Sequence, residues 1–137
     1  MKPVAYLVAA PALAVLASPA PAHAPHVGPA GGQTIHWGAY HFELLPGQNG
    51  SRVFVYRASD RKPVPAAAMS ATARLLTGGK LVSARFQPAG GNVLASKQAR
   101  LAGDWTASIS FKLPGAAPTI RFSARELAAL RRSGAKG

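Results

Sequence analysis

The chain has 137 residues, and its 16 Lys and Arg against four Asp and Glu give a formal net charge of +12 with neutral histidines. This length accommodates one domain of ordinary size. The absence of cysteine excludes disulfides, zinc–thiolate sites, iron–sulfur clusters and a thiol nucleophile. Four acidic residues also leave few carboxylates for paired acid–base catalysis or for a calcium site.

Residues 1–22 have the pattern of a secretory signal peptide. Lys2 gives a positive start, an apolar run follows over residues 4–17, and small residues come after it. The run is about 14 residues long, whereas a membrane-spanning helix needs roughly 20. No second long apolar stretch follows, so we expect an exported protein, periplasmic or secreted, that does not span the membrane once the signal is removed.

Two Ala-x-Ala sequences offer cleavage sites, one ending at Ala22 and one at Ala24. A cut after Ala24 would place Pro25 next to the scissile bond, where its fixed φ fits poorly. Cleavage after Ala22 is therefore favoured, and it makes His23 the first residue of the mature chain.

Residues 23–34 are rich in Pro and Gly and lack periodicity, so we expect a flexible arm. From residue 35 to residue 123, apolar and polar side chains alternate, as in strands with one buried and one solvated face. The clearest apolar set is Trp105, Ala107, Ile109, Phe111 and Leu113. About seven short strands separated by turn residues predict an all-β fold, an immunoglobulin-like antiparallel β-sandwich.

One helix is predicted at the end of the chain. Ser123 and Glu126 have the spacing of a capping box, and Leu127 and Leu130 follow. We therefore expect residues 124–137 to form a short helix and a basic tail.

The stretch Gly32–Leu45 resembles the opening strand of a bacterial periplasmic family that pairs a Gly-rich, often His-containing arm with a Tyr-His-x-Glu strand. The later landmarks are Val53-Phe-Val-Tyr56, Asp60-Arg-Lys-Pro-Val64, Phe86-Gln-Pro-Ala-Gly-Gly-Asn92, Gly103-Asp-Trp105 and Arg121-Phe122. These features are similar to small β-sandwich proteins found beside heavy-metal efflux systems, and loosely to YtkA-like and CopC-like domains. Over about residues 32–123, the resemblance implies an immunoglobulin-like fold, a copper or heavy-metal role, and efflux components as partners.

All four histidines lie near the start of the mature chain: His23, His26, His36 and His41. Without cysteine, imidazole is the strongest available ligand for Cu(II), Ni(II) or Zn(II). The α-amine and Nδ1 of an N-terminal His23 can chelate one metal ion together, and either His26 or His41 can supply another imidazole. The resemblance to CopC-like proteins, which use an N-terminal histidine in this way, implies the same role for His23. The alternative is a mobile arm with solvated histidines.

His41 and Glu43 are two residues apart, so a strand places them on the same face with Cα atoms about 6.5–7 Å apart. They are either two ligands of a metal site or a charge-assisted pair on a solvated surface. His36 has the opposite parity, so an unbroken strand directs it away from His41, and only a bulge at Gly38 would change that. The predicted metal ligands are therefore His23, His26, His41 and Glu43, with copper(II) as the candidate cofactor.

An enzyme is not expected, because the chain lacks G-x-S-x-G, H-E-x-x-H and phosphate-loop motifs. Trp105 and Met69 are predicted to pack in the core. Basic side chains occupy solvated or mixed strand positions: Arg52, Arg74, Arg85, Lys112 and Arg121. They favour an alternative function, a metal-free envelope module whose basic face docks an acidic protein or an anionic surface. Nucleic acid is not an expected partner, because no exposed aromatic residues are interleaved with these cations.

Overall fold

The computed structural model of the chain describes residues 24–134, so the predicted signal peptide and His23 lie outside the described residues. The elements in chain order are β1 (His26–Val27), β2 (Gln33–Trp37), β3 (Tyr40–Leu45), β4 (Ser51–Arg57), β5 (Ser70–Thr77), β6 (Lys80–Pro88), β7 (Val93–Ser96), β8 (Thr106–Lys112), β9 (Thr119–Ser123) and α1 (Ala124–Ser133). All strand pairs are antiparallel, and the strands form one sheet in the order β1-β2-β3-β4-β7-β6-β5-β8-β9.

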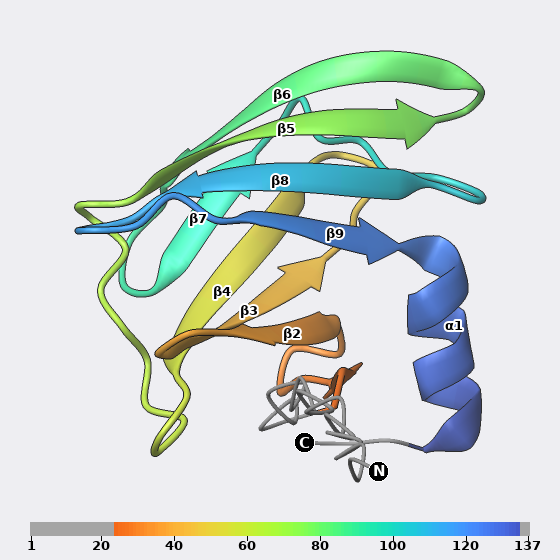
Figure 1. Ribbon diagram of the computed structural model, residues 1–137. Helices are drawn as coiled ribbons and strands as arrows, with labels where there is room; N and C mark the ends of the chain where they lie inside the picture. Colours follow the sequence, from red (N-terminus) through yellow and green to blue (C-terminus); the bar gives the residue numbers. More distant parts are fainter. Residues whose placement is uncertain (1–23, 135–137) are drawn as a thin grey trace, which may run out of the picture.

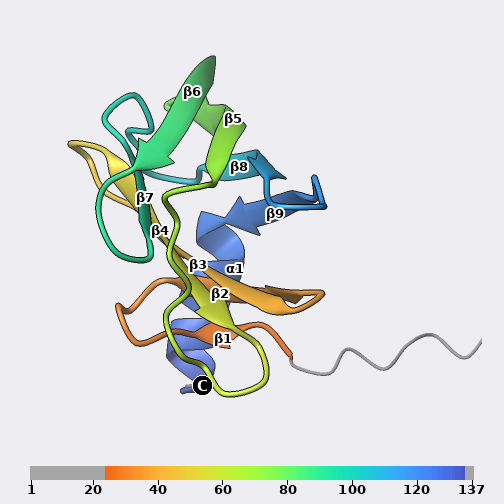
Figure 2. The same cartoon turned by 90° about the vertical axis from the view of Figure 1, so that its left-hand side faces the viewer.

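The sheet curls on itself, so that β5, β8 and β9 lie across from β2, β3 and β4 (Figure 1). β6 pairs with β5 along most of its length but with β7 only through Gln87 and Pro88, and the view in Figure 2 shows the two halves diverging beyond this point. The predicted all-β class with a short C-terminal helix is confirmed. Within residues 24–134 the strands number nine rather than about seven, and they form one half-barrel because β7 hydrogen-bonds to both halves.

The core lies between the two halves of the curled sheet. Phe42 on β3 stacks on Phe111 on β8 with ring centroids 4.3 Å apart, which joins one half to the other. The apolar side chains that alternate along residues 35–123 supply most of the core, including Phe42, Leu44, Ala71, Ala73, Leu75, Ala84, Phe86, Ala107, Ile109, Phe111, Ile120 and Phe122. Trp105 and Met69 are buried as well, so both pack as predicted.

Gln33 joins the beginning of the sheet to its end. Its Nε2 donates to Oε2 of Glu126 at 2.7 Å, and its Oε1 accepts from the backbone N–H of Ser123 at 3.0 Å. The side chain is fully buried, so β2 is held against the junction of β9 and α1. In a capping box the glutamate would accept the N–H of the cap residue directly. Here the side chain of Gln33 lies between the Glu126 carboxylate and the Ser123 N–H and hydrogen-bonds to both.

α1 begins at the predicted cap, because the Ser123 hydroxyl accepts the backbone N–H of Glu126 at 3.1 Å. It ends at Gly134, whose φ of 69° is a left-handed conformation that glycine adopts easily. The helix has ten residues and stands beside the ends of β9 and β2 (Figure 1). Over residues 24–134, no helix has the length and apolar character needed to cross a membrane.

Replacing Gln33 by Met should destabilise the fold. Methionine keeps the length of the side chain but cannot make the two partly buried hydrogen bonds, one of them to a carboxylate, and this loss costs about 1–3 kcal/mol. Denaturant titration of Gln33→Met measures this loss. Gln48→Met, at an exposed position, is the control and should change the free energy of unfolding by less than about 0.5 kcal/mol. Equal stability of the two variants would contradict the role of Gln33.

Candidate functional site

Three histidines gather on the outer face of β1, β2 and β3. β2 and β3 form a hairpin in which His36 lies directly opposite His41. Directly opposed residues of an antiparallel pair share a face of the sheet. The prediction that His36 points away from His41 is therefore wrong, because the chain reverses at Gly38, whose φ of 56° suits a two-residue hairpin turn.

The segment expected to be a flexible arm is ordered in its described part, residues 24–34. It contributes β1, in which His26 pairs with Thr34 of β2, and it then folds back over the outer face of β3. A Cβ added to Gly28 would overlap Thr34 and the carboxyl group of Glu43, so this close approach requires glycine. β3 is consequently covered on both faces, by the core on one side and by this segment on the other.

The carboxylate of Glu43 holds this segment in place. Its Oε2 accepts the backbone N–H groups of Ala30 at 2.9 Å and Gly32 at 2.8 Å, and its Oε1 accepts Ala30 at 3.2 Å. Glu43 is fully buried and His41 is 2% exposed, so the predicted pair on a solvated surface is wrong. Because both oxygens accept backbone N–H groups, the geometry makes Glu43 an anchor for the segment and leaves the ligand role to the imidazoles.

The imidazoles of His26, His36 and His41 lie close together, and we call them the histidine cluster. His41 is central, with its ring centroid 5.6 Å from that of His26 and 5.2 Å from that of His36. His26 uses Nδ1 to bond the carbonyl of Ala24 at 3.1 Å, and His36 uses Nε2 to bond the carbonyl of Gly38 at 2.7 Å. A carbonyl only accepts, so these nitrogens carry hydrogen and the lone pairs lie on Nε2 of His26 and Nδ1 of His36.

A cavity of about 30 Å³ adjoins the cluster, enough for one water molecule or one ion. Its lining consists of His26, Pro29, Thr34, His41, Tyr56 and Arg61. The hydroxyl of Thr34 is buried and has no hydrogen-bond partner among the described residues. An unpartnered buried hydroxyl is costly, so a small polar occupant would be stabilised here.

Tyr56 lines this cavity from β4, where it lies opposite His41. Burial raises the pKa of Tyr56 above its usual value of 10.0, and the negative charge of Glu43 raises it further, although a hydrogen bond with Asn92 acts in the other direction. The phenol therefore stays protonated at neutral pH and offers a hydroxyl, not a phenolate.

The donor atoms of the histidine cluster are of the kind that a transition-metal ion prefers. Two imidazoles that share one ion have ring centres about 5 Å apart, given metal–nitrogen bonds of about 2.0–2.1 Å. Metal-binding histidines commonly donate their second ring N–H to a backbone carbonyl, as His26 and His36 do. Within the described part of the chain, no three His, Asp or Glu side chains already surround a common point. Binding would therefore require the imidazoles to rotate toward one another.

Sequence reasoning placed His26 and His41 together but missed His36, Thr34 and Tyr56. The signal for His36 was present in Trp37-Gly-Ala-Tyr40, where a glycine opens a two-residue turn between strand-forming residues. Tyr56 and Thr34 reach the site only through the pairing of β4 with β3 and of β2 with β3, which no local pattern reveals.

Comparison of the chain with protein-family models, with curated proteins and with solved structures finds no match. Function is therefore inferred from the side chains themselves.

Glu43→Gln should release the segment that covers β3. The amide keeps one acceptor oxygen but turns an NH₂ group toward backbone N–H donors, which costs about 1–3 kcal/mol. Hydrogen exchange at the amides of Ala30 and Gly32 should become faster than in the unchanged protein. Asp60→Asn removes a carboxylate from the exposed pair with Arg57 and should leave exchange at these amides unaltered. Unchanged protection in Glu43→Gln would rule out the anchoring role.

Proposed function

We propose that this chain is an exported, non-catalytic protein that binds a transition-metal ion of the copper type through the histidine cluster. The observation that carries the proposal is the meeting of three imidazoles on one face of the sheet, two of which hydrogen-bond to backbone carbonyls. The predicted secretory signal supports export, since residues 1–22 have the composition of one.

The donor set favours a late first-row ion over a hard cation. Calcium and magnesium require several oxygen ligands, whereas the cluster offers nitrogen, and the nearest carboxylate, Glu43, is engaged by backbone N–H groups. Imidazole suits copper, nickel and zinc, and Cu(II) binds most tightly in this series. Glu43 also contributes a buried negative charge near the site, which offsets the neighbouring Arg61.

The surroundings of the cluster suit transfer of the ion as well as binding. His26 and His36 are partly exposed while His41 is buried, so a partner could approach two of the three imidazoles. Cleavage after Ala22 would add the α-amine and imidazole of His23 close in sequence to His26. The resemblance to periplasmic proteins of heavy-metal efflux systems suggests the role of this chain, which is to hand the ion over to efflux components. The same resemblance would make the half-barrel an immunoglobulin-like domain.

Titration of the chain beginning at His23 with Cu(II) tests this function. His26→Ala and His36→Ala should each weaken binding of Cu(II) by about tenfold or more, since each removes one coordinate bond. Both side chains are partly exposed. His41→Ala should weaken binding as well, and thermal unfolding shows whether that variant remains folded. Lys62→Ala, at an exposed position outside the cluster, is the control and should leave the affinity unchanged.

Two results would count against the histidine cluster. One is an affinity for Cu(II) weaker than micromolar in the unchanged chain. The other is an affinity that falls only in His23→Ala, which would assign the ion to an N-terminal chelate instead.

A further inference from the structure

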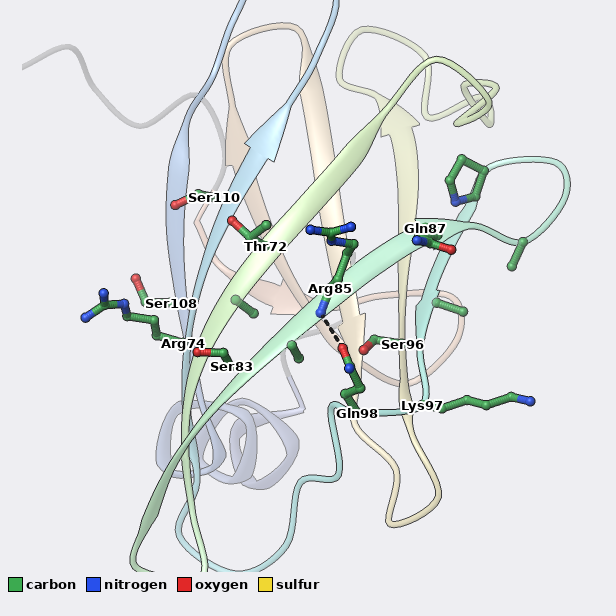
Figure 3. A pocket seen from close by; sticks show the side chains of 15 residues that line it. Thr72, Arg74, Ser83, Arg85, Gln87, Ser96, Lys97, Gln98, Ser108 and Ser110 are labelled. Atoms are coloured by element: carbon green, nitrogen blue, oxygen red, sulfur yellow. Dashed lines mark hydrogen bonds between the residues drawn. The ribbon is translucent and has the colours of Figure 1, made fainter.

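A second polar surface lies away from the histidine cluster, over the outer side of β5, β6 and β8. A groove of about 910 Å³ runs between this side of the sheet and the Lys97–Gln98 segment (Figure 3). Arg74, Arg85 and Lys97 are its cations, and we call it the basic groove. Its hydroxyl groups come from Thr72, Ser83, Ser96, Ser108 and Ser110.

Within residues 24–134, no acidic side chain pairs with the cations of the basic groove. The four Asp and Glu side chains have other partners. Glu43 accepts the amides of Ala30 and Gly32, and Glu126 accepts Gln33 at 2.7 Å. Asp60 pairs with Arg57 at 2.9 Å, and Asp104 pairs with Arg125 at 3.4 Å. None of the four lines the groove. A concave surface lined by positively charged side chains attracts an anionic ligand.

The groove also contains a buried polar atom that lacks a partner. Ser96 is 4% exposed, and within residues 24–134 its Oγ makes no hydrogen bond. Ser96 lies at the end of β7 and lines the groove beside Gln98 (Figure 3). Because this oxygen is covered by protein atoms, the cations and the open strand edge, rather than the Ser96 hydroxyl, are the groups that a ligand in the groove meets.

One wall of the groove is an open strand edge. The backbone N–H of Arg85 points away from β5 and donates to Oε1 of Gln98 at 3.0 Å, so a side chain occupies the place of a neighbouring strand (Figure 3). Alternate residues of a strand direct their backbone groups to the same side. Ser83 and Leu81 therefore present N–H and C=O groups on this side, where none of the described strands pairs with them.

The outer face becomes apolar toward the hairpin between β5 and β6. Leu76 and Leu81 lie opposite each other there, with exposed fractions of 41% and 82%. Exposed leucines paired in this way offer a small contact for one apolar side chain.

We propose that the basic groove binds an extended acidic segment of a partner protein, which adds to the edge of β6 as a further strand. Acidic side chains at every second position would meet Arg74, Arg85 and Lys97, while the backbone pairs with Leu81 and Ser83. A peptide backbone is the ligand that an open strand edge recognises, whereas a flat anionic membrane does not enter a hollow. This site is independent of the histidine cluster and of any metal.

The probe is a fluorescein-labelled peptide with glutamate at every second position and a leucine near one end. Fluorescence anisotropy should show binding that weakens as salt rises. The double variant Arg74→Gln/Arg85→Gln should bind about tenfold or more weakly, because it loses two charge-assisted contacts. The matched control, Lys62→Gln/Arg132→Gln, removes the same charge from exposed positions outside the groove and should bind as the unchanged protein does.

Two further probes separate strand addition from general attraction of charge. The same peptide with glutamine in place of glutamate should not bind, and a peptide N-methylated on the edge that faces β6 should bind much more weakly. Equal loss in both double variants, or equal binding of the N-methylated peptide, would overturn the proposal. So would binding to phosphatidylserine vesicles that depends on Arg74 and Arg85 while the acidic peptide fails to bind.

Discussion

The candidate metal site depends on the hydrogen bonds that the buried carboxylate of Glu43 accepts from the backbone. A carboxylate removed from water is strongly destabilising unless hydrogen bonds compensate it, and here the N–H groups of Ala30 and Gly32 do so. These bonds draw a segment rich in Gly and Pro over a strand face that would otherwise be solvated. His41 becomes buried as a result, and His26 is brought beside it. The charge of Glu43 thus acts on the fold and on the electrostatics of the neighbouring cavity at once.

The parts of the fold that depend on local pattern could be predicted from the sequence. Strict alternation over residues 104–113 predicted the buried side of β8, including Ile109 and Phe111. The capping spacing of Ser123 and Glu126 predicted where α1 begins. Both signals are local, because they arise from side-chain periodicity or from one turn of a helix.

The rest of the fold depends on contacts between residues that are far apart in the sequence. Residues 24–34 have no periodicity, and their order comes from Glu43 and from the pairing of β1 with β2. The single half-barrel depends on β7, which pairs with both β4 and β6, and on Gln33, which reaches residues 90 and 93 positions away. At the candidate site, composition alone indicated the histidines, but cross-strand register decided which of them meet.

The distribution of charge divides the molecule into two surfaces with different chemistry. Near the histidine cluster, a buried carboxylate moderates the excess of cations, and imidazole nitrogens gather. Along the basic groove no carboxylate is present, and the open edge of β6 adds backbone groups to the cations. Three of the 16 Lys and Arg therefore line a groove that favours a different ligand from the one that the imidazoles favour.

The most direct test of the metal site is nuclear magnetic resonance of the ¹⁵N-labelled chain beginning at His23, with sub-stoichiometric Cu(II). Paramagnetic broadening falls steeply with distance, so it reports where the ion resides. Under the assignment of the ion to the histidine cluster, signals of His26, His36 and His41 should broaden first, together with those of Thr34 and Tyr56 beside them. Broadening confined to the first residues of the chain, or spread evenly over the surface, would contradict it.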